Sequence, residues 1–530
     1  MSSLPAAPAA KAGIARSTGV LSLATAASRV LGFIRDLLMA RLFGTLVEAE
    51  AFVVAFRLPN LFRDLVAEGA MASAVVPVLT RYRTKESPEE FQRLSQALFS
   101  QMAVALCLLG AGGALAAPLI VRVVAPGFAA DPDKFALTVL LTRLIFPFIT
   151  LVGLWAYFMG WLNTLRHFAV PALGPALLNL AMIIACVWFV PRSSPGVVAL
   201  AVAVMIGGVI QILIQLPVAW RLGFRFKWIW RHEGSREMLR LMGPRMIGSA
   251  AYQVNVLVDT VLASLSGVVG AGAVAAIYYA NRLVQLPLAL FGTASAQASL
   301  PSLSERAANG DLEGFGATLR AVLRMVAFVV LPSSVGLMVL AYPIVVGLFE
   351  RGAFDHRSSV MTATALIYYA LGLLAYSVVK VISGAFYALQ DTRTPVRLAV
   401  ETVIVNVLLC LLLMWPLKVG GLALAAALSN SLNAFRLTRG MERRLGQPLL
   451  APLAGMLGRV TGASLLMGAG CWGLWTAAGL SRHPWVGLAV VIAAGVLLYT
   501  AACRLLRVQE LSTILRWLNT FLFPPRSASA

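Results

Sequence analysis

The sequence has little charge and few of the side chains from which catalytic and metal sites are built. Only 12% of its 530 residues are Asp, Glu, Lys or Arg, and it has four histidines and five cysteines. The histidines form no HExxH pattern and the cysteines no CxxC pair, and there is neither the Gly-Lys dipeptide of a P-loop nor a GxSxG nucleophile elbow. We therefore expect a protein that is not an enzyme and that needs no cofactor.

Hydrophobic residues, by contrast, make up 59% of the chain, with a mean hydropathy of +0.84. This composition is typical of an all-α polytopic membrane protein. Apolar runs interrupted by Pro, Gly or charge predict about fourteen transmembrane helices, and residues 1–16, which lack the apolar core of a signal peptide, are expected to be a cytoplasmic tail. The expected spans are 17–44, 50–80, 95–124, 135–162, 169–190, 196–220, 238–266, 270–304, 318–349, 358–389, 395–415, 418–436, 452–480 and 484–507.

The basic residues indicate how the chain is oriented. The net charge is +21, and most of the excess lies in the loops that follow the even-numbered spans. By the positive-inside rule these loops, and with them both termini, are expected to be cytoplasmic. The basic loop residues are Arg81, Arg83, Lys85, Arg93, Arg166, Arg221, Arg225, Lys227, Arg231, Arg236, Arg306, Arg320, Arg393, Arg397, Arg436, Arg439, Arg443, Arg444, Arg504 and Arg507.

One of these loops, WRLGFRFKWIWRHEG at residues 220–234, interleaves tryptophan with arginine and lysine. The pattern resembles a nucleic-acid patch, but in a membrane protein it favours an aromatic anchor beside anionic lipid. We therefore expect membrane lipids, and no nucleic acid, as partners. Beyond residue 507, leucines and an isoleucine at helical spacing predict either an interfacial helix or a merely solubilising end over 508–530.

An internal repeat organises the chain. Shifting it by about 224 residues aligns RDLLMARLFG with VDTVLASLSG and AFVVAFRL with AIYYANRL, so that Arg57 falls opposite Arg282 and Asp36 opposite Asp259. The offset persists through six successive spans. The sequence therefore predicts two pseudo-symmetric six-helix lobes, 17–235 and 236–447, related by an axis along the membrane normal with a site between them, followed by an additional helix pair at 448–507.

The stretch from residue 28 to residue 77 combines apolar helices with an unusual set of charges. An arginine at the bilayer centre costs about 2.5–3.5 kcal/mol, so several together require water, a counter-ion or a ligand. Pairs seven residues apart share a helical face and could pair, while Gly32 and Pro59 allow bends. The arginine surplus predicts a cavity for an anion. Because the planar guanidinium fork matches phosphate oxygens, we expect that anion to be phosphorylated. An arginine such as Arg57 could instead reach the cytoplasmic surface. Among its apolar residues the stretch carries Arg29, Arg35, Asp36, Glu50, Arg57, Arg63, Asp64 and Glu68.

Polar residues elsewhere in the apolar spans leave more than one interpretation open. Asp259 could bind a coupling monovalent cation or pair with an arginine. Lys380 and Glu401 also lie in apolar runs, and Glu401 is close enough to Arg397 to be structural. The amides of Asn60, Asn255, Asn281 and Gln285 could line the cavity or bond one helix to another.

Five motifs carry a family resemblance over almost the whole chain: SRVLGFIRD, AFRLPNLFRDLVAEGA, YYANRLVQLP, LPSLS and FYALQDTRTPV. Together they resemble the MurJ (MviN) lipid II flippases, in the multidrug/oligosaccharidyl-lipid/polysaccharide exporter superfamily. The resemblance implies two six-helix lobes around a central cavity and a last helix pair that forms a groove for the undecaprenyl tail. It also implies a multi-pass protein of the bacterial cytoplasmic membrane with a role in peptidoglycan biosynthesis, lipid II as substrate, and cell-wall synthesis proteins as possible partners.

The resemblance also assigns substrate contacts to particular residues. The cavity arginines of the family map onto Arg29, Arg35, Arg63 and Arg282. Two positions depart from the family pattern: the acid usual before the AF pair is the longer Glu50, and the aspartate often found before the eighth-helix arginine is Asn281. The full set of expected substrate-binding residues is Arg29, Arg35, Asp36, Glu50, Arg57, Asn60, Arg63 and Arg282.

We therefore expect a flippase that works by alternating access, with the arginines taking the diphosphate headgroup and the membrane potential or a monovalent ion supplying energy. A drug or cation antiporter of the same superfamily would favour carboxylates over arginines in the cavity. A polysaccharide-unit flippase fits the same residues. A non-transporting scaffold for cell-wall synthesis would need no charges inside the membrane.

Overall fold

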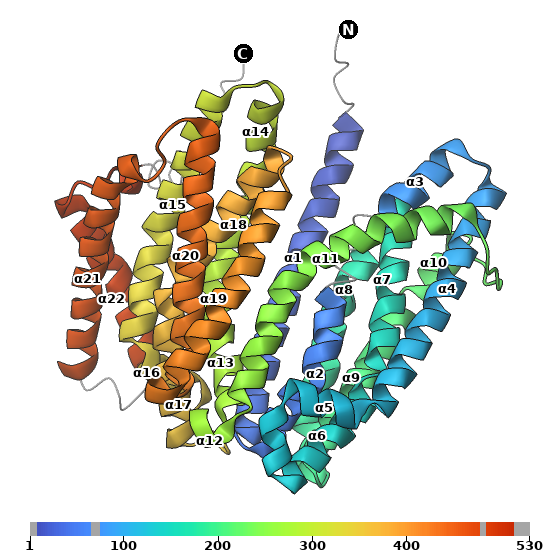
Figure 1. The fold of residues 1–530 in the computed structure, drawn as a ribbon, viewed down its shortest axis with the longest axis horizontal. Coiled ribbons are helices and arrows are strands. Elements are labelled where there is room, and N and C mark those ends of the chain that lie inside the picture. The colour runs from blue at the N-terminus through green and yellow to red at the C-terminus, as the bar shows by residue number, and fades with distance from the viewer. Residues whose placement is uncertain (1–7, 65–74, 478–483, 513–530) are drawn as a thin grey trace. The chain divides into compact units, whose positions relative to one another are not determined.

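The computed structural model describes residues 8–64, 75–477 and 484–512, and every regular element in them is a helix (Figure 1). The chain divides into two compact units, unit 1 ending at Ser266 and unit 2 beginning at Gly267. Each of the fourteen expected spans coincides with one helix or with a broken pair, apart from residues 65–74 and 478–480, which lie outside the described residues. The all-α fold class predicted from the sequence is confirmed.

Unit 1 contains long helices interrupted by short breaks. The first helix begins at Pro8, nine residues before the predicted start, because the alanine-rich residues ahead of the span also favour helix. The helices of unit 1 are α1 (Pro8–Phe43), α2 (Val47–Arg63), α3 (Val76–Lys85), α4 (Pro88–Leu115), α5 (Ala117–Val124), α6 (Pro132–Ile145), α7 (Phe148–Thr164), α8 (Ala169–Ile184), α9 (Gly196–Leu213), α10 (Leu216–Arg221) and α11 (Glu233–Ala263).

Within unit 1, α1 packs on α8, α8 on α9, α2 on α6, and α4 on α7. Small residues allow some of these close approaches. A Cβ at Gly207 of α9 would lie 2.7 Å from Leu178 Cδ1 of α8, too close for any side chain to be added without a shift. Helix α11 packs on α4 and α5 and so belongs to the compact unit 1, whereas the predicted lobe boundary lies before it at 235/236. The assignment of α11 to a functional lobe stays a prediction.

Unit 2 holds the remaining helices. Its most extensive contacts join α19 to α20, α15 to α21, α21 to α22, and α20 to both α17 and α18. The helices are α13 (Ala273–Pro287), α14 (Ala294–Ala308), α15 (Leu312–Val339), α16 (Ala341–Phe349), α17 (His356–Leu371), α18 (Leu373–Ala388), α19 (Arg393–Leu417), α20 (Val419–Leu445), α21 (Ala454–Ala477) and α22 (Pro484–Leu505), with the short α12 (Ser266–Val269) at the junction of the two units.

The predicted repeat is visible in the helix boundaries. Helices α5 and α16 begin at Ala117 and Ala341, 224 residues apart, and the starts of α4 and α15, of α6 and α17, and of α8 and α19 show the same spacing. The helix caps repeat as well. The carboxylate of Asp131 accepts the backbone N–H of Lys134 at 3.1 Å, and that of Asp355, 224 residues later, accepts the N–H of Ser358 at 2.8 Å. Because an N-cap residue determines where a helix begins, the start of this helix is specified in the same way in both halves of the chain.

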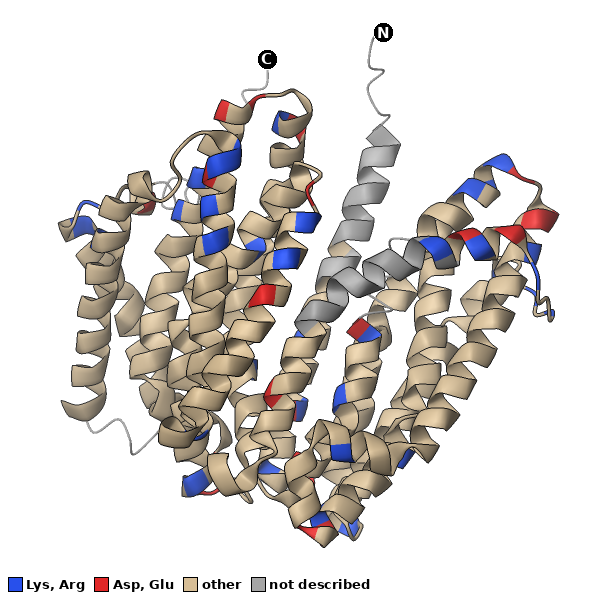
Figure 2. Ribbon diagram, viewed as in Figure 1, with Lys and Arg blue, Asp and Glu red and all other residues tan. Residues whose placement is uncertain are grey.

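Eight helices in the described residues are long and apolar enough to cross a membrane, or up to nine if α17 and α18, which meet at a 45° bend, form one span. Several of the other expected spans carry too many charges or are broken into shorter helices, and the full count of fourteen stays a prediction. Figure 2 shows that in unit 2 most of the lysines and arginines lie at one end of the helices, where α14 and α20 end, and that fewer lie at the opposite end. This chain is thus a multi-pass membrane protein, whose predicted topology with both termini in the cytoplasm stays a prediction.

Candidate functional site

The charges of α1 lie in two different environments. The guanidinium of Arg35 is buried, with 7% of the residue exposed. Its Nη1 donates to Asn179 Oδ1 on α8 at 2.8 Å, and its Nη2 lies 2.7 Å from the carboxylate of Asp36. Asn179 in turn donates to the Ser28 carbonyl at 3.0 Å, and a Cβ at Gly32 would lie only 3.3 Å from its amide nitrogen. Gly32 therefore lets α8 approach α1 closely, and Arg35 is held in that contact.

Arg29, two turns earlier on α1, is exposed. No hydrogen bond or ion pair joins it to any other residue in the described part of the chain. It is flanked on the same helix by exposed apolar side chains, Leu23, Val30 and Ile34. A guanidinium in such a setting requires water or an anion, because hydrocarbon would leave its five N–H groups unsatisfied.

Glu50, near the start of α2, is buried with only 3% of the residue exposed. Its carboxylate forms an ion pair with Lys134 of α6, whose ammonium also lies 3.9 Å from the centre of the Phe128 ring. The pair joins α2 to α6 and gives the acid a structural role. A contact between Glu50 and substrate stays a prediction.

The remaining polar residues of α2 are half-buried. Arg57 Nε donates to Thr260 Oγ1 of α11 at 3.1 Å, so this arginine reaches a neighbouring helix instead of the end of its own. Arg63 pairs with Asp64 at 3.0 Å, with 29% and 31% of the two side chains exposed. Asn60 is half-buried one turn before Arg63. The ion pairs observed on Asp36 and Asp64 are with the adjacent arginine, where the sequence suggested partners seven residues away.

In unit 2, Arg282 of α13 lies over the ring of Tyr278, with its Cζ 4.9 Å from the ring centre and Nη2 3.1 Å from the hydroxyl. The stacking fixes the direction of the guanidinium along the helix. Gln285 donates to Asn281 Oδ1 at 2.8 Å, so these two amides bond within one helix. That these two amides line a substrate cavity stays a prediction.

Asp259 is half-buried on α11, and Asn255 lies one turn before it. The adjacent Thr260 accepts the hydrogen bond from Arg57, which brings a permanent positive charge to this part of α11. That charge disfavours a bound cation, so the arrangement supports Asp259 as a counter-charge better than as a metal ligand. No group of three or more His, Cys, Asp or Glu that could hold a metal ion occurs in the described residues. The proposed cation site at Asp259 stays a prediction.

Glu401 of α19 forms ion pairs with neighbouring arginines, as expected for a structural residue. It lies 3.6 Å from Arg397 on its own helix and forms a second ion pair with Arg436 of α20. Lys380 of α18 is exposed.

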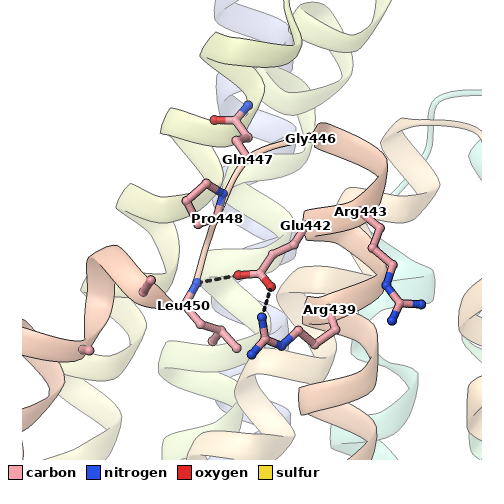
Figure 3. A pocket seen from close by; sticks show the side chains of 9 residues that line it. Arg439, Glu442, Arg443, Gly446, Gln447, Pro448 and Leu450 are labelled. Carbon is pink, nitrogen blue, oxygen red and sulfur yellow. Dashed lines mark hydrogen bonds and ion pairs between the residues drawn. The ribbon is translucent and has the colours of Figure 1, made fainter.

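A pocket of about 690 Å³ lies at the junction between α20 and α21 (Figure 3). The carboxylate of Glu442 accepts the backbone N–H groups of Leu449 and Leu450 at 2.8 and 2.9 Å and pairs with Arg439 at 3.0 Å. Arg443 also lines the pocket. Glu442 therefore fastens the start of the last helix pair to the end of α20, close to the boundary predicted at 447/448.

The structure thus brings the predicted residues together in smaller groups. Arg35 and Asp36 meet at Asn179, Arg57 reaches α11 beside Asp259, and Arg63 stays with Asp64. Sequence reasoning missed Asn179 and Lys134. Both are polar residues in apolar surroundings, but neither belongs to the conspicuous charged stretch of α1 and α2, and nothing in the sequence alone shows which helices meet. That the predicted residues together bind the substrate stays a prediction.

Comparisons with known proteins give the family. A family model described as lipid II flippase MurJ matches residues 39–492. The chain is 34% identical over 506 residues to a probable lipid II flippase MurJ of Vibrio cholerae serotype O1, covering 92% of this chain and 95% of that relative. It is 36% identical over 426 residues to the lipid II flippase MurJ of Burkholderia cenocepacia, covering 79% and 82%.

Among solved structures, a lipid II flippase MurJ in an inward closed conformation matches with a TM-score of 0.78 at 26% identity, over 92% of this chain and 98% of that one. An inward-facing multidrug resistance MATE transporter of the MOP superfamily matches with a TM-score of 0.67 at 15% identity, which is a likeness of fold alone. The repeat, the arginines within apolar helices and the resemblance of the motifs agree with these matches. This chain belongs to the lipid II flippase MurJ family.

Proposed function

We propose that this protein is a lipid II flippase of the bacterial cytoplasmic membrane. It moves the undecaprenyl-diphosphate-linked peptidoglycan precursor from the inner to the outer leaflet. The observation that carries the proposal is Arg29, an exposed guanidinium with no partner among the described residues, in the helix α1 that the sequence predicts as the first span. The diphosphate of the substrate is an anion with the geometry that arginine binds best.

Further arginines support an anionic substrate. Arg57 and Arg63 are half-buried on α2, and Arg282 is half-buried on α13, so each keeps part of its surface accessible. A cationic drug would require the opposite charge, which makes a drug antiporter the weaker candidate. A polysaccharide-unit flippase shares the anionic lipid carrier, and its substrate differs only in the sugars.

The mechanism we propose is alternating access. The two lobes open toward the cytoplasm, the arginines take the diphosphate, and the lobes then rock to release the headgroup outside. The undecaprenyl tail stays in lipid along α21 and α22. The repeat in helix boundaries supports this mechanism, because two similar bundles can exchange inward and outward arrangements around one site.

For energy we propose the membrane potential. An anion that moves outward travels toward the positive side, and two charges crossing fully would gain about 4.6 kcal/mol per 100 mV. The idea is tested in reconstituted vesicles in which the cytoplasmic face of the protein is toward the lumen. Movement of the lipid II headgroup from the inner to the outer leaflet is measured at zero and at inside-negative potential. A faster rate under the negative potential is expected, and equal rates would reject electrical driving.

The function itself is tested by depletion in the native bacterium. Loss of the protein should trap the undecaprenyl-linked precursor in the inner leaflet, as measured by the fraction that an external enzyme can modify. Plasmid-borne wild type should restore the outer-leaflet fraction, and Arg29→Ala at equal protein level should not. Arg41→Ala, which removes an exposed arginine from the end of the same helix, is the matched control and should restore it. Normal outward accumulation during depletion would contradict the flippase and leave the scaffold as the alternative.

A further inference from the structure

The segment between α10 and α11 is an extended strap pinned along α4. Its residues 224–232 adopt no helix, and Phe224 is buried at its start. Gln96 Nε2 donates to the Arg225 carbonyl at 2.7 Å, and Gln101 Nε2 donates to the Trp230 carbonyl at 2.6 Å. Polar side chains of α4 thus donate hydrogen bonds to backbone carbonyls of the strap, as a neighbouring strand would, and these bonds fix its direction.

Because the strap is extended, its side chains alternate between two sides. One side carries aromatic rings, of which Phe226, Trp228 and Trp230 are more than half exposed. Trp228 and Trp230 stack with their ring centres 6.1 Å apart. The intervening positions include Arg225, Lys227 and Arg231, all exposed. Aromatic and basic side chains in this arrangement are suited to the boundary between lipid tails and headgroups.

A pocket of about 700 Å³ lies where the end of the strap meets α4 and the start of α11. Its two ends differ in chemistry. The apolar end is formed by Leu98, Met102, Ala105 and Leu108, which follow one another at helical spacing along one face of α4. The polar end contains Arg231 and Arg236, for which the described residues offer no ion pair, with Glu233 as the opposing charge.

His232 closes the polar end. Its Nε2 lies 3.2 Å from a carboxylate oxygen of Glu90, and its Nδ1 accepts the backbone N–H of Gly234 at 3.1 Å. Glu90 also pairs with Arg93 at 3.2 Å. These acidic and histidine side chains are therefore engaged with one another, which leaves the two lining arginines to set the charge of the pocket.

We propose that this pocket is a binding site for one anionic phospholipid. Arg231 and Arg236 hold the phosphate, the ring of Trp230 lies at the glycerol level, and one acyl chain follows the apolar face of α4. The occupant is anionic because the polar end has two arginines against one glutamate, and it is a lipid because an apolar groove of four side chains continues from that end. The site goes beyond the transport function, and it would fasten the strap, and with it the start of α11, to the membrane surface.

The test uses the purified full-length protein and a photoactivatable phosphatidylglycerol whose reactive group is on one acyl chain. Labelled peptides from residues 98–108 are expected. The double variant Arg231→Gln/Arg236→Gln should weaken labelling by about 30-fold, which corresponds to about 2 kcal/mol for two basic residues beside an anionic headgroup. The matched control Arg225→Gln/Lys227→Gln removes the same charge from the strap outside the pocket and should change labelling less than about threefold.

Two further arms separate the alternatives. Ala105→Trp fills the apolar end without altering charge and should block labelling, which keeps the test valid if the arginine variant fails to fold. Phosphatidylcholine with the same chains should label weakly, and soluble glycerol phosphate in excess should not compete. Equal losses in the two double variants, equal labelling by phosphatidylcholine, or labels outside α4 and residues 230–238 would overturn the proposal. Because the readout is binding, its failure would leave the flippase function untouched.

Discussion

The buried ion pair between Glu50 and Lys134 offers the sharpest test of how the charges of α2 are used. Lys134→Met removes the ammonium but keeps most of the side-chain volume, and it leaves a carboxylate that is 3% exposed without its cation. Breaking a buried pair from one side costs about 3–5 kcal/mol. The contact between the ammonium and the Phe128 ring at 3.9 Å is lost as well. The effect should therefore exceed that of any exposed pair.

The assay is thermal unfolding of the purified protein in detergent, followed by tryptophan fluorescence. In a unit of this size, 1 kcal/mol shifts the midpoint by about 2–4 °C, so the single variant should unfold about 6–20 °C lower. The double variant Glu50→Gln/Lys134→Met removes both charges and should recover most of that loss. Arg63→Met, which breaks a half-exposed pair, is the control and should shift the midpoint by no more than about 4 °C.

Two results would refute this reasoning. A shift below about 2 °C for Lys134→Met, or a double variant no more stable than the single one, would show that the pair does not hold α2 against α6. A double variant that is stable but inactive in lipid II transport would instead support the sequence-based prediction that Glu50 contacts the substrate.

Three further predictions rest on other contacts. Asn179→Leu removes the acceptor of a buried guanidinium on α1 and should lower the free energy of unfolding by about 1.5–3 kcal/mol, measured against wild type by denaturant titration. Hydrogen bonds, above all from the backbone N–H of Thr394, lower the pKa of Asp391. The ionised carboxylate therefore stabilises the fold at pH values above its ordinary pKa, and this contribution is lost as the pH falls through the lowered pKa. The hydroxyl of Thr394 also donates to Asp391 Oδ2, at 2.8 Å, and Thr394→Val removes this bond. The variant should destabilise the protein at pH 7 but much less at a pH low enough to protonate Asp391, as melting curves at the two pH values would show. Gly127→Ala should destabilise unit 1, because the new Cβ would lie 2.1 Å from the carbonyl oxygen of Ser264, and a midpoint equal to that of wild type would contradict the packing described here.

The helices and the repeat could be predicted from the sequence because both depend on local sequence patterns. Apolar runs of membrane length, interrupted by proline, glycine and capping residues, occur at a nearly constant offset in both halves. Asp131 and Asp355 illustrate this, since each caps a helix through an interaction with a residue three positions later. Such short-range contacts need no knowledge of how helices pack.

The environment of each charge could not be predicted in the same way. Arg29 and Arg35 are six residues apart in one motif, yet one is exposed and the other is buried against α8. The difference arises from Asn179, 144 residues away from Arg35, and from the close approach that Gly32 allows. Similarly, Lys134 in a predicted span far along the chain decides the role of Glu50. Long-range packing, which helical periodicity does not specify, separates the structural charges from those available to a ligand.

The most direct test of the account is the rate at which the purified protein moves lipid II across a reconstituted membrane. Vesicles that contain wild-type protein should expose the headgroup on the opposite leaflet faster than protein-free vesicles, and Arg29→Ala should slow the rate toward that of protein-free vesicles while Arg41→Ala leaves it unchanged. A rate for Arg29→Ala equal to that of wild type would contradict the claim that an exposed guanidinium within the membrane takes the diphosphate.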